Sequence, residues 1–316
     1  CNHGGSSRKR LTMGAGHSRD GHKLIESLPF DQREGIVVVP PKDEELALTT
    51  MKRAFCGYGT IPEFGLDWIF SVGIVRALTM RPLPPEIPHG PTLRQPVKGH
   101  EVFKPLPPQS DGSFQQDPVH WACYRWLFRF CLYEMAQTGL VFGIKNTEAR
   151  GGDGGEGYAA VMLCQPPGYS GGLVSSLVAG YKAGLVPPWE NTKDEKLLQV
   201  KARMDGMMPM MKKCHKECAP EKHWYIYMLQ VDPSHQGQKL GKRLLSFVFA
   251  LADEQGVPTY LETVGDRNIA IYEKLGFKVV NKYPCMVGQG AKIGGPGLTE
   301  GGGMTGMKRP PSASAA

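Results

Sequence analysis

The spacing of apolar residues changes along residues 224–280, and the change predicts a strand, a turn and then a helix. Residues 224–231 form an apolar, aromatic and β-branched run that is typical of a largely buried strand. Residues 235–241 are polar and contain two glycines, which indicates a turn. Apolar residues then recur at steps of three and four, the spacing of one helix face. That face consists of Leu240, Leu244, Leu245, Val248, Phe249 and Ala252.

The same arguments predict a mixed α/β (α+β) fold for the rest of the chain. Runs of β-branched or apolar residues indicate strands at residues 36–39, 140–144, 158–164, 259–264 and 304–309. Helical spacing indicates helices at residues 43–55, 121–136 and 186–222, and a helical or mixed segment at 66–80. Loops are expected at residues 146–157 and, rich in glycine, at 284–303.

We expect a single domain over residues 36–309, with disordered tails at 1–35 and 310–316. Two insertions interrupt this domain. The insertion at about 81–118 contains many of the 26 prolines. Its proline runs favour extended conformations, which suit a loop on the surface or a binding site for an SH3-like partner. The insertion at 186–222 is rich in methionine, whose flexible thioethers suit either a lid over a small-molecule pocket or ordinary core filling.

Composition narrows the classes of partner. The chain has 316 residues, 41% of them hydrophobic, and a net charge of +7, a mild basic excess that suits a polyphosphate ligand. Aromatic residues do not interleave with basic ones, so we expect no nucleic acid partner. No apolar stretch approaches the ~18 residues that a membrane helix needs, so no membrane partner is expected either. The residues leave the oligomeric state open.

The eight cysteines are scattered, and several lie inside apolar stretches, which indicates reduced thiols of an intracellular, cytoplasmic protein. Cys214, His215 and Cys218 lie close together, but structural zinc needs four ligands and no matching second pair follows. We therefore expect no metal. The sequence begins with Cys1 rather than methionine, which we interpret as a fragment or a processed product.

The glycine-bearing turn before the helix at residue 240 predicts a binding site for an anion. Backbone N–H groups at a helix start have no acceptor within the helix, and the helix dipole also favours negative charge there. Gly237 and Gly241 allow the backbone to approach a ligand closely. A phosphate-bearing ligand is the expected occupant.

The turn resembles the phosphate loop of the GNAT superfamily of acyl-CoA-dependent N-acetyltransferases. The family pattern is Gln/Arg-x-x-Gly-x-Gly/Ala, and residues 236–241 match its first and last positions. Lys239 replaces the central glycine, so the loop needs an allowed φ for lysine or a slight displacement, and the ammonium group could contact phosphate. Further tracts are similar to the puromycin N-acetyltransferase-like group: Gly256-Val257-Pro258, Leu261-Glu262-Thr263, Arg267-Asn268 and Tyr272-Glu273-Lys274-Leu275-Gly276-Phe277.

The resemblance implies a mixed, splayed central sheet with helices on both faces. It also implies acetyl-CoA as a co-substrate between two parted strands, residues 224–231 and 259–264. Backbone groups of Leu229 and Val231 would bind the pantetheine arm. The pyrophosphate would meet the amides of Gln236, Gly237, Gln238, Lys239, Leu240 and Gly241. Lys242 would contact phosphate or remain a solvated helix residue, and Asn268 would cap its helix, contact the cofactor, or do both.

Two residues are candidates for catalysis, Tyr272 from the resemblance and Glu262 because a carboxylate on a half-buried strand is costly unless paired. Tyr272 would donate a proton to the departing sulfur, since a phenol with pKa near ~10 stays protonated at neutral pH; the alternative is a packed helix tyrosine. Glu262 is our choice of general base, acting directly or through water, and the alternative is a salt bridge or structural support. Tyr225, Tyr227 and His223 would line the acceptor pocket or relay protons.

These inferences predict an enzyme that moves acetyl from acetyl-CoA to a primary amine of a small molecule, by direct attack in a ternary complex. Two alternatives remain open. The acceptor could be a protein N-terminus or lysine, or the chain could be a non-catalytic acyl-CoA-binding module that keeps the fold.

Overall fold

The computed structural model describes residues 17–29, 33–56, 118–146, 157–169, 172–193, 195–232, 235–263, 266–283, 286–287, 291–292 and 304–312. The segment expected at 66–80 lies outside these residues. So does the proline-rich insertion, apart from its last residue.

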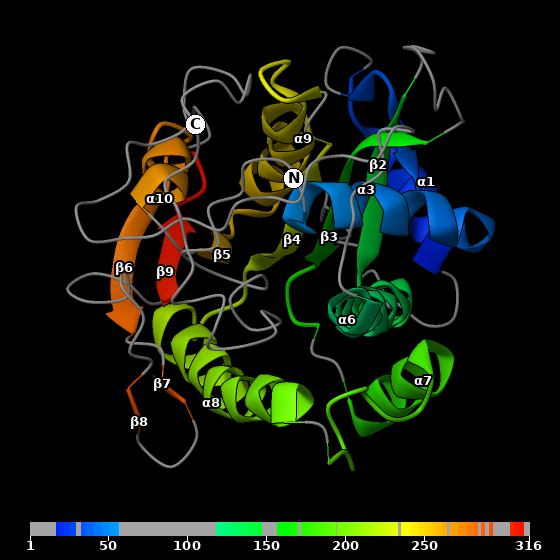
Figure 1. Cartoon of the computed structure of the whole chain (residues 1–316). Coiled ribbons are helices and arrows are strands. Elements are labelled where there is room, and N and C mark those ends of the chain that lie inside the picture. Colours follow the sequence, from blue (N-terminus) through cyan, green and yellow to red (C-terminus); the bar gives the residue numbers. More distant parts are fainter. Residues whose placement is uncertain are drawn as a thin grey trace, which may run out of the picture.

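A seven-stranded mixed sheet forms the centre of the molecule, in the order β1-β2-β3-β4-β5-β9-β6 (Figure 1). β4 and β5 are its parallel pair, and every other neighbouring pair is antiparallel. This confirms the expected mixed sheet. The strands are β1 (Ile36–Val38), β2 (Leu140–Lys145), β3 (Tyr158–Gln165), β4 (Trp224–Val231), β5 (Thr259–Thr263), β6 (Lys278–Tyr283) and β9 (Met304–Arg309). A separate hairpin pairs β7 (Met286–Val287) with β8 (Ala291–Lys292).

Helices cover both faces of this sheet. On one face, here called the α8 face, the core is built with α3 (Glu44–Cys56), α6 (Pro118–Thr138) and α8 (Glu195–Cys218). On the other, the α9 face, it is built with α1 (His17–Ser27), α9 (Leu240–Gln255) and α10 (Asp266–Glu273). A short helix, η1 (Pro41–Asp43), precedes α3, and α7 (Leu173–Ala183) packs on α6 on the side away from the sheet (Figure 1).

The parallel pair β4 and β5 separates partway along its length. Pairing begins at Trp224 with Thr259 and ends at Ile226 with Leu261, although β4 continues to Val231. The β3–β4 register shifts at this point, because Cys164 pairs with Ile226 and Leu163 with Met228, which leaves Tyr227 as an extra residue. A bulge of this kind bends its strand and increases the local twist. The splayed sheet that the sequence predicted is therefore present.

The bulge also changes which residues face which side. Before it, Tyr225 faces the α8 face and its neighbours Trp224 and Ile226 face the α9 face. After the bulge, Leu229 and Val231 pack on the α9 face. Side chains alternate between the two faces along a strand, and the extra residue shifts this alternation by one position.

Within three segments that the sequence predicted as tails or loop, the structure places ordered residues. Residues 1–35 were expected to be disordered, but α1 lies within them because Leu24, Ile25 and Leu28 provide one apolar helix face that packs into the core. The loop expected at 284–303 contains β7 and β8. The tail expected from residue 310 is ordered at Ser312, whose N–H donates to Asp253 Oδ1 at 2.8 Å.

The methionine-rich insertion forms α8, as predicted, and α7 precedes it along the chain. Met204, Met207 and Met210 recur at helical spacing and are buried in the core of the α8 face. The structure thus supports the core-filling interpretation of these methionines. The helix also contains Pro209, and it ends beside the sheet, where Cys214 and Cys218 are buried free thiols. Among the described residues, no helix is long and apolar enough to cross a membrane.

A glycine on β9 sets how closely α8 approaches the sheet. A Cβ added to Gly306 would lie 2.5 Å from Cys218 Sγ and 3.1 Å from Cys214 Sγ. Gly306→Ala should lower the free energy of unfolding by about 1–3 kcal/mol, because overpacking forces the helix and strand apart. Urea unfolding measures the change. Gly172→Ala is the matched control, since nothing lies within 4 Å of its added Cβ. An equal effect of both variants would contradict the prediction.

Candidate active site

The predicted phosphate loop is a left-handed turn that leads into α9. Gly237 has φ of +82° and Lys239 has φ of +62°, both in the left-handed region. Lys239 therefore takes the backbone conformation that the family pattern assigns to glycine. Arg243 N–H donates to Lys239 C=O at 3.0 Å, and this bond starts the helical ladder. The N–H groups of Leu240, Gly241 and Lys242 precede it and have no acceptor within the helix.

This loop lies over the end of β4. A Cβ on Gly241 would meet Val231 Cγ2 at 3.4 Å and Leu229 Cδ2 at 3.6 Å. The first turn of α9 thus packs directly on the strand segment that has parted from β5. The structure brings these predicted cofactor-binding residues together: Leu229, Val231, Gln236, Gly237, Gln238, Lys239, Leu240, Gly241 and Lys242.

The surface of the loop suits a polyphosphate. Lys239 and Lys242 are exposed, and the side chain of the first helical residue, Leu240, is buried, so Leu240 offers only its backbone amide. Open space surrounds the Cα of Gly237, where an added Cβ would touch nothing within 4 Å. Free amides, two ammonium groups and an open approach fit a diphosphate group. Asn268, the remaining predicted cofactor-binding residue, is exposed in the first turn of α10.

Glu262 lies on β5 just beyond the point at which β4 and β5 part. It follows Tyr260 by two residues and so shares the α8 face with it. The Tyr225 hydroxyl donates to Glu262 Oε2 at 2.6 Å, whereas Oε1 is buried without a hydrogen-bond partner among the described residues. The side chain is 5% exposed, and this burial raises the pKa of Glu262 to about 7. The carboxyl group can therefore gain and lose a proton near neutral pH.

Tyr272 lies on the opposite face. It is partly buried against the core of the α9 face, where its ring meets Phe277 edge-on at 5.7 Å between centroids. Burial raises the pKa of Tyr272 to about 12, which keeps the phenol protonated. The two predicted catalytic residues are thus separated by the sheet. A molecule that contacts both must lie in the opening between β4 and β5.

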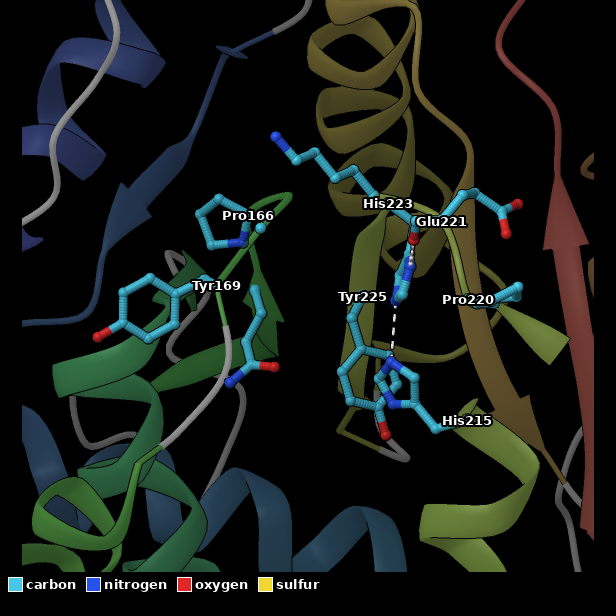
Figure 2. Close-up of a pocket in the computed structure, with 11 residues that line it drawn as sticks. Pro166, Tyr169, His215, Pro220, Glu221, His223 and Tyr225 are labelled. Atoms are coloured by element: carbon cyan, nitrogen blue, oxygen red, sulfur yellow. Dashed lines mark hydrogen bonds between the residues drawn. The ribbon is translucent and has the colours of Figure 1, made fainter. Parts of the chain in front are cut away.

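A cavity of about 260 Å³ opens on the α8 face, at the end of β4 opposite the phosphate loop. Figure 2 shows His215, on α8, beside His223 on one side of the cavity, with the Tyr225 ring next to them and Pro166 and Tyr169 on the other side. His215 Nδ1 lies 3.7 Å from Glu262 Oε1, which connects the cavity to the buried carboxyl group. The cavity is lined by Gln165, Pro166, Gly168, Tyr169, His215, Ala219, Pro220, Glu221, Lys222, His223 and Tyr225.

Sequence reasoning missed several of these residues. It considered His215 only as a metal ligand, and it gave no role to Gln165 or Tyr169. Gln230 was also missed: it is 1% exposed on β4, and neither its amide nitrogen nor its carbonyl oxygen has a partner in the described part of the chain. A polar residue inside an apolar strand was the available signal for Gln230. Within the described ranges, no group of three or more His, Cys, Asp or Glu residues is placed to hold a metal ion.

Residues 202–277 match the family model described as Acetyltransferase (GNAT) family. The matched segment contains the loop, β4, β5 and both predicted catalytic residues. The match supports a GNAT acetyltransferase assignment for this part of the chain. The narrower similarity to the puromycin N-acetyltransferase-like group stays a prediction.

Individual relatives are similar over limited lengths or at low identity. An uncharacterized N-acetyltransferase of Schizosaccharomyces pombe, C550.08, is 35% identical over 54 residues, which are 17% of this chain. The chain matches 22% of the length of that relative. A histone acetyltransferase HPA2 and related acetyltransferase from Corynebacterium glutamicum has a TM-score of 0.44 at 15% identity, over 89% of this chain and 98% of that chain. Arylalkylamine N-acetyltransferase 2 from Aedes aegypti has a TM-score of 0.45 at 12% identity, over 87% of this chain and 97% of that chain.

The raised pKa of Glu262 has a consequence for stability. The folded protein binds the proton of Glu262 more tightly than the unfolded chain does, because the pKa of the carboxyl group is about 7 when folded and ~4.3 when unfolded. This difference adds to the free energy of unfolding at pH values below ~4.3, and the contribution is lost as the pH rises through about 7. Glu262→Gln removes this titration. The free energy of unfolding of the variant, relative to wild type, should therefore increase from about pH 5 to about pH 7 and then level off.

Urea unfolding of both proteins across this pH range measures the difference. Glu254→Gln is the control, because Glu254 is exposed on α9. A difference for Glu262→Gln that does not change with pH would show that the carboxyl group titrates at an ordinary pKa.

Proposed function

We propose that this protein transfers acetyl from acetyl-CoA to a primary amine of a small molecule, by direct attack in a ternary complex. The observation that supports the proposal is the parting of β4 from β5. The predicted anion-binding loop packs on the parted segment of β4, and the buried carboxyl group of Glu262 lies where the two strands part. The GNAT family match over residues 202–277 supports the same reaction.

The loop residues would hold the co-substrate. Amides at the start of α9, together with the ammonium groups of Lys239 and Lys242, would bind the pyrophosphate. The parted segment of β4, at Leu229 and Val231, leaves backbone groups that no longer pair with β5 and so are available to the pantetheine arm. An amide near Leu229 would stabilise the developing oxyanion.

Glu262 would act as the general base. An alkyl ammonium group has a pKa near ~10, so it must lose a proton before it attacks the thioester. A carboxylate with a pKa near the working pH combines a large deprotonated fraction with enough basicity to accept that proton. Burial supplies that pKa here, and Tyr225 fixes the orientation of the carboxyl group by donating to Oε2.

Tyr272 would act as the general acid. The departing thiolate needs a proton, and a buried phenol with a raised pKa keeps its proton until the thiolate forms. The base and the acid would then act from the two faces of the sheet, with the thioester between them.

A small-molecule acceptor is supported by the cavity and by the predicted, narrower resemblance to the puromycin N-acetyltransferase-like group. A space of about 260 Å³ lies just below the range of roughly 300–1,000 Å³ that is usual for small-molecule sites, so it suits a small acceptor better than a polypeptide. Its lining from Gln165, Tyr169 and His223 offers hydrogen-bonding groups as well as an aromatic ring.

The reaction is tested by the release of free thiol from acetyl-CoA with three sets of acceptors: a panel of small primary amines, peptides with free N-termini, and lysine peptides. We expect amine-dependent release with the small amines. Release with peptides alone would assign a protein acetyltransferase instead. If calorimetric titration shows that acetyl-CoA binds but no acceptor releases thiol, the chain is a non-catalytic acyl-CoA-binding module.

Tyr272→Phe should keep the affinity for acetyl-CoA and lose about 10- to 1,000-fold in kcat, because the phenyl ring preserves the packing on Phe277 but cannot donate a proton. Steady-state thiol release and calorimetric titration measure the two quantities. Tyr181→Phe provides the matched control, since Tyr181 is 65% exposed on α7. An unchanged kcat in Tyr272→Phe would remove the proton-donor role.

A further inference from the structure

We propose that His215 and His223 form a two-imidazole relay that carries the proton from Glu262 to solvent in the cavity on the α8 face. The pair lies between Glu262 and the cavity. His215 Nδ1 faces Glu262 Oε1 at 3.7 Å, and His215 Nε2 lies 2.9 Å from His223 Nε2. This inference rests on the proposed function, because it assigns the exit path for the proton that Glu262 removes from the amine.

The buried carboxyl group needs such a path. Glu262 is 5% exposed, so after it accepts a proton it has little direct access to water. One oxygen already accepts from Tyr225, and the other, Oε1, is the atom that faces His215. Oε1 is also the buried oxygen without a hydrogen-bond partner in the described ranges. The gap between Oε1 and Nδ1 is about 0.5 Å beyond a long hydrogen bond.

The hydrogen bonds fix the direction of transfer. His223 Nδ1 lies 2.6 Å from the backbone carbonyl oxygen of Glu221, which can only accept, so Nδ1 carries the hydrogen (Figure 2). Neutral His223 then has its lone pair on Nε2, and His215 must donate to it from its own Nε2. Neutral His215 is left with its lone pair on Nδ1. That lone pair faces Glu262, ready to accept a proton.

Both imidazoles are neutral at physiological pH. Burial lowers the pKa of His215 to about 4, helped by the neighbouring His223, and burial also lowers the pKa of His223. The ionisable groups around the pair come from four elements. They are Glu221, which is paired with Lys308 on β9, and Tyr225, Tyr260 and Glu262 of the sheet.

The transfer conserves protons at each step. Glu262 takes one proton from the ammonium group of the acceptor and becomes a neutral acid. Its proton passes to His215 Nδ1 as the Nε2 proton of His215 passes to His223 Nε2. His223 then releases one proton to the cavity, which it lines, and Glu262 is again a carboxylate. His215 is left with its hydrogen on Nδ1, and proton exchange with water in the cavity, which both rings line, restores the starting tautomers before the next turnover.

The test replaces each histidine with glutamine, which keeps hydrogen-bonding capacity but cannot change charge. In His215→Gln and His223→Gln, kcat for the amine should fall at least about 10-fold, by the magnitude of general acid–base effects, and the KM for acetyl-CoA should stay unchanged. Added imidazole should restore part of kcat in the variants and have no effect on wild type. His22→Gln is the matched control, because His22 is exposed on α1.

The outcomes separate the relay from the proposed function. If wild type releases no thiol with any amine, the proposed function fails and the relay fails with it. If wild type is active and both variants keep its kcat, only the relay is overturned. A loss of kcat that imidazole does not restore, together with a lower Tm, indicates structural support and also overturns the relay. His223→Gln keeps the test decisive if His215→Gln fails to fold.

Discussion

The parting of β4 from β5 is the constraint on which the rest of the site depends. Their parallel pairing stops at Ile226 and Leu261 because an extra residue, Tyr227, bends β4 away. A closed sheet would separate its two faces completely. The opening would let one bound molecule contact the proposed acid on the α9 face and the proposed base on the α8 face, and it leaves strand groups unpaired with β5 beside the predicted anion-binding loop.

The carboxyl group of Glu262 lies where β4 and β5 part, and burying a charged carboxylate there is unfavourable. Full burial of an unpaired carboxylate is highly unfavourable, so the group shifts its pKa towards neutrality instead. Glu262 does so, and a short hydrogen bond from Tyr225 orients it. The general base that we propose needs the same raised pKa, so a position that is unfavourable for folding would suit that role.

Helix α8 connects the core to the cavity. Its methionines fill the core of the α8 face, and Gly306 allows its last turns to lie against β9. This tight contact places His215 next to Glu262 and opposite His223. The insertion that carries α8 therefore serves packing along most of its length and the site at its C-terminal end.

The sequence by itself determined the local elements that carry the site. Residues 224–280 specify a strand, a glycine turn and a helix through short-range periodicity, and the turn chemistry identifies an anion site, because these signals depend only on neighbours in the chain. It did not reveal α1 or the position of His215 beside Glu262. Only the tertiary structure decided that His215 meets Glu262, 47 residues later, because that contact depends on how closely α8 packs on the sheet. It also placed Glu262 and Tyr272 on opposite faces, since the bulge at Tyr227 and the resulting opening come from strand pairing between distant segments.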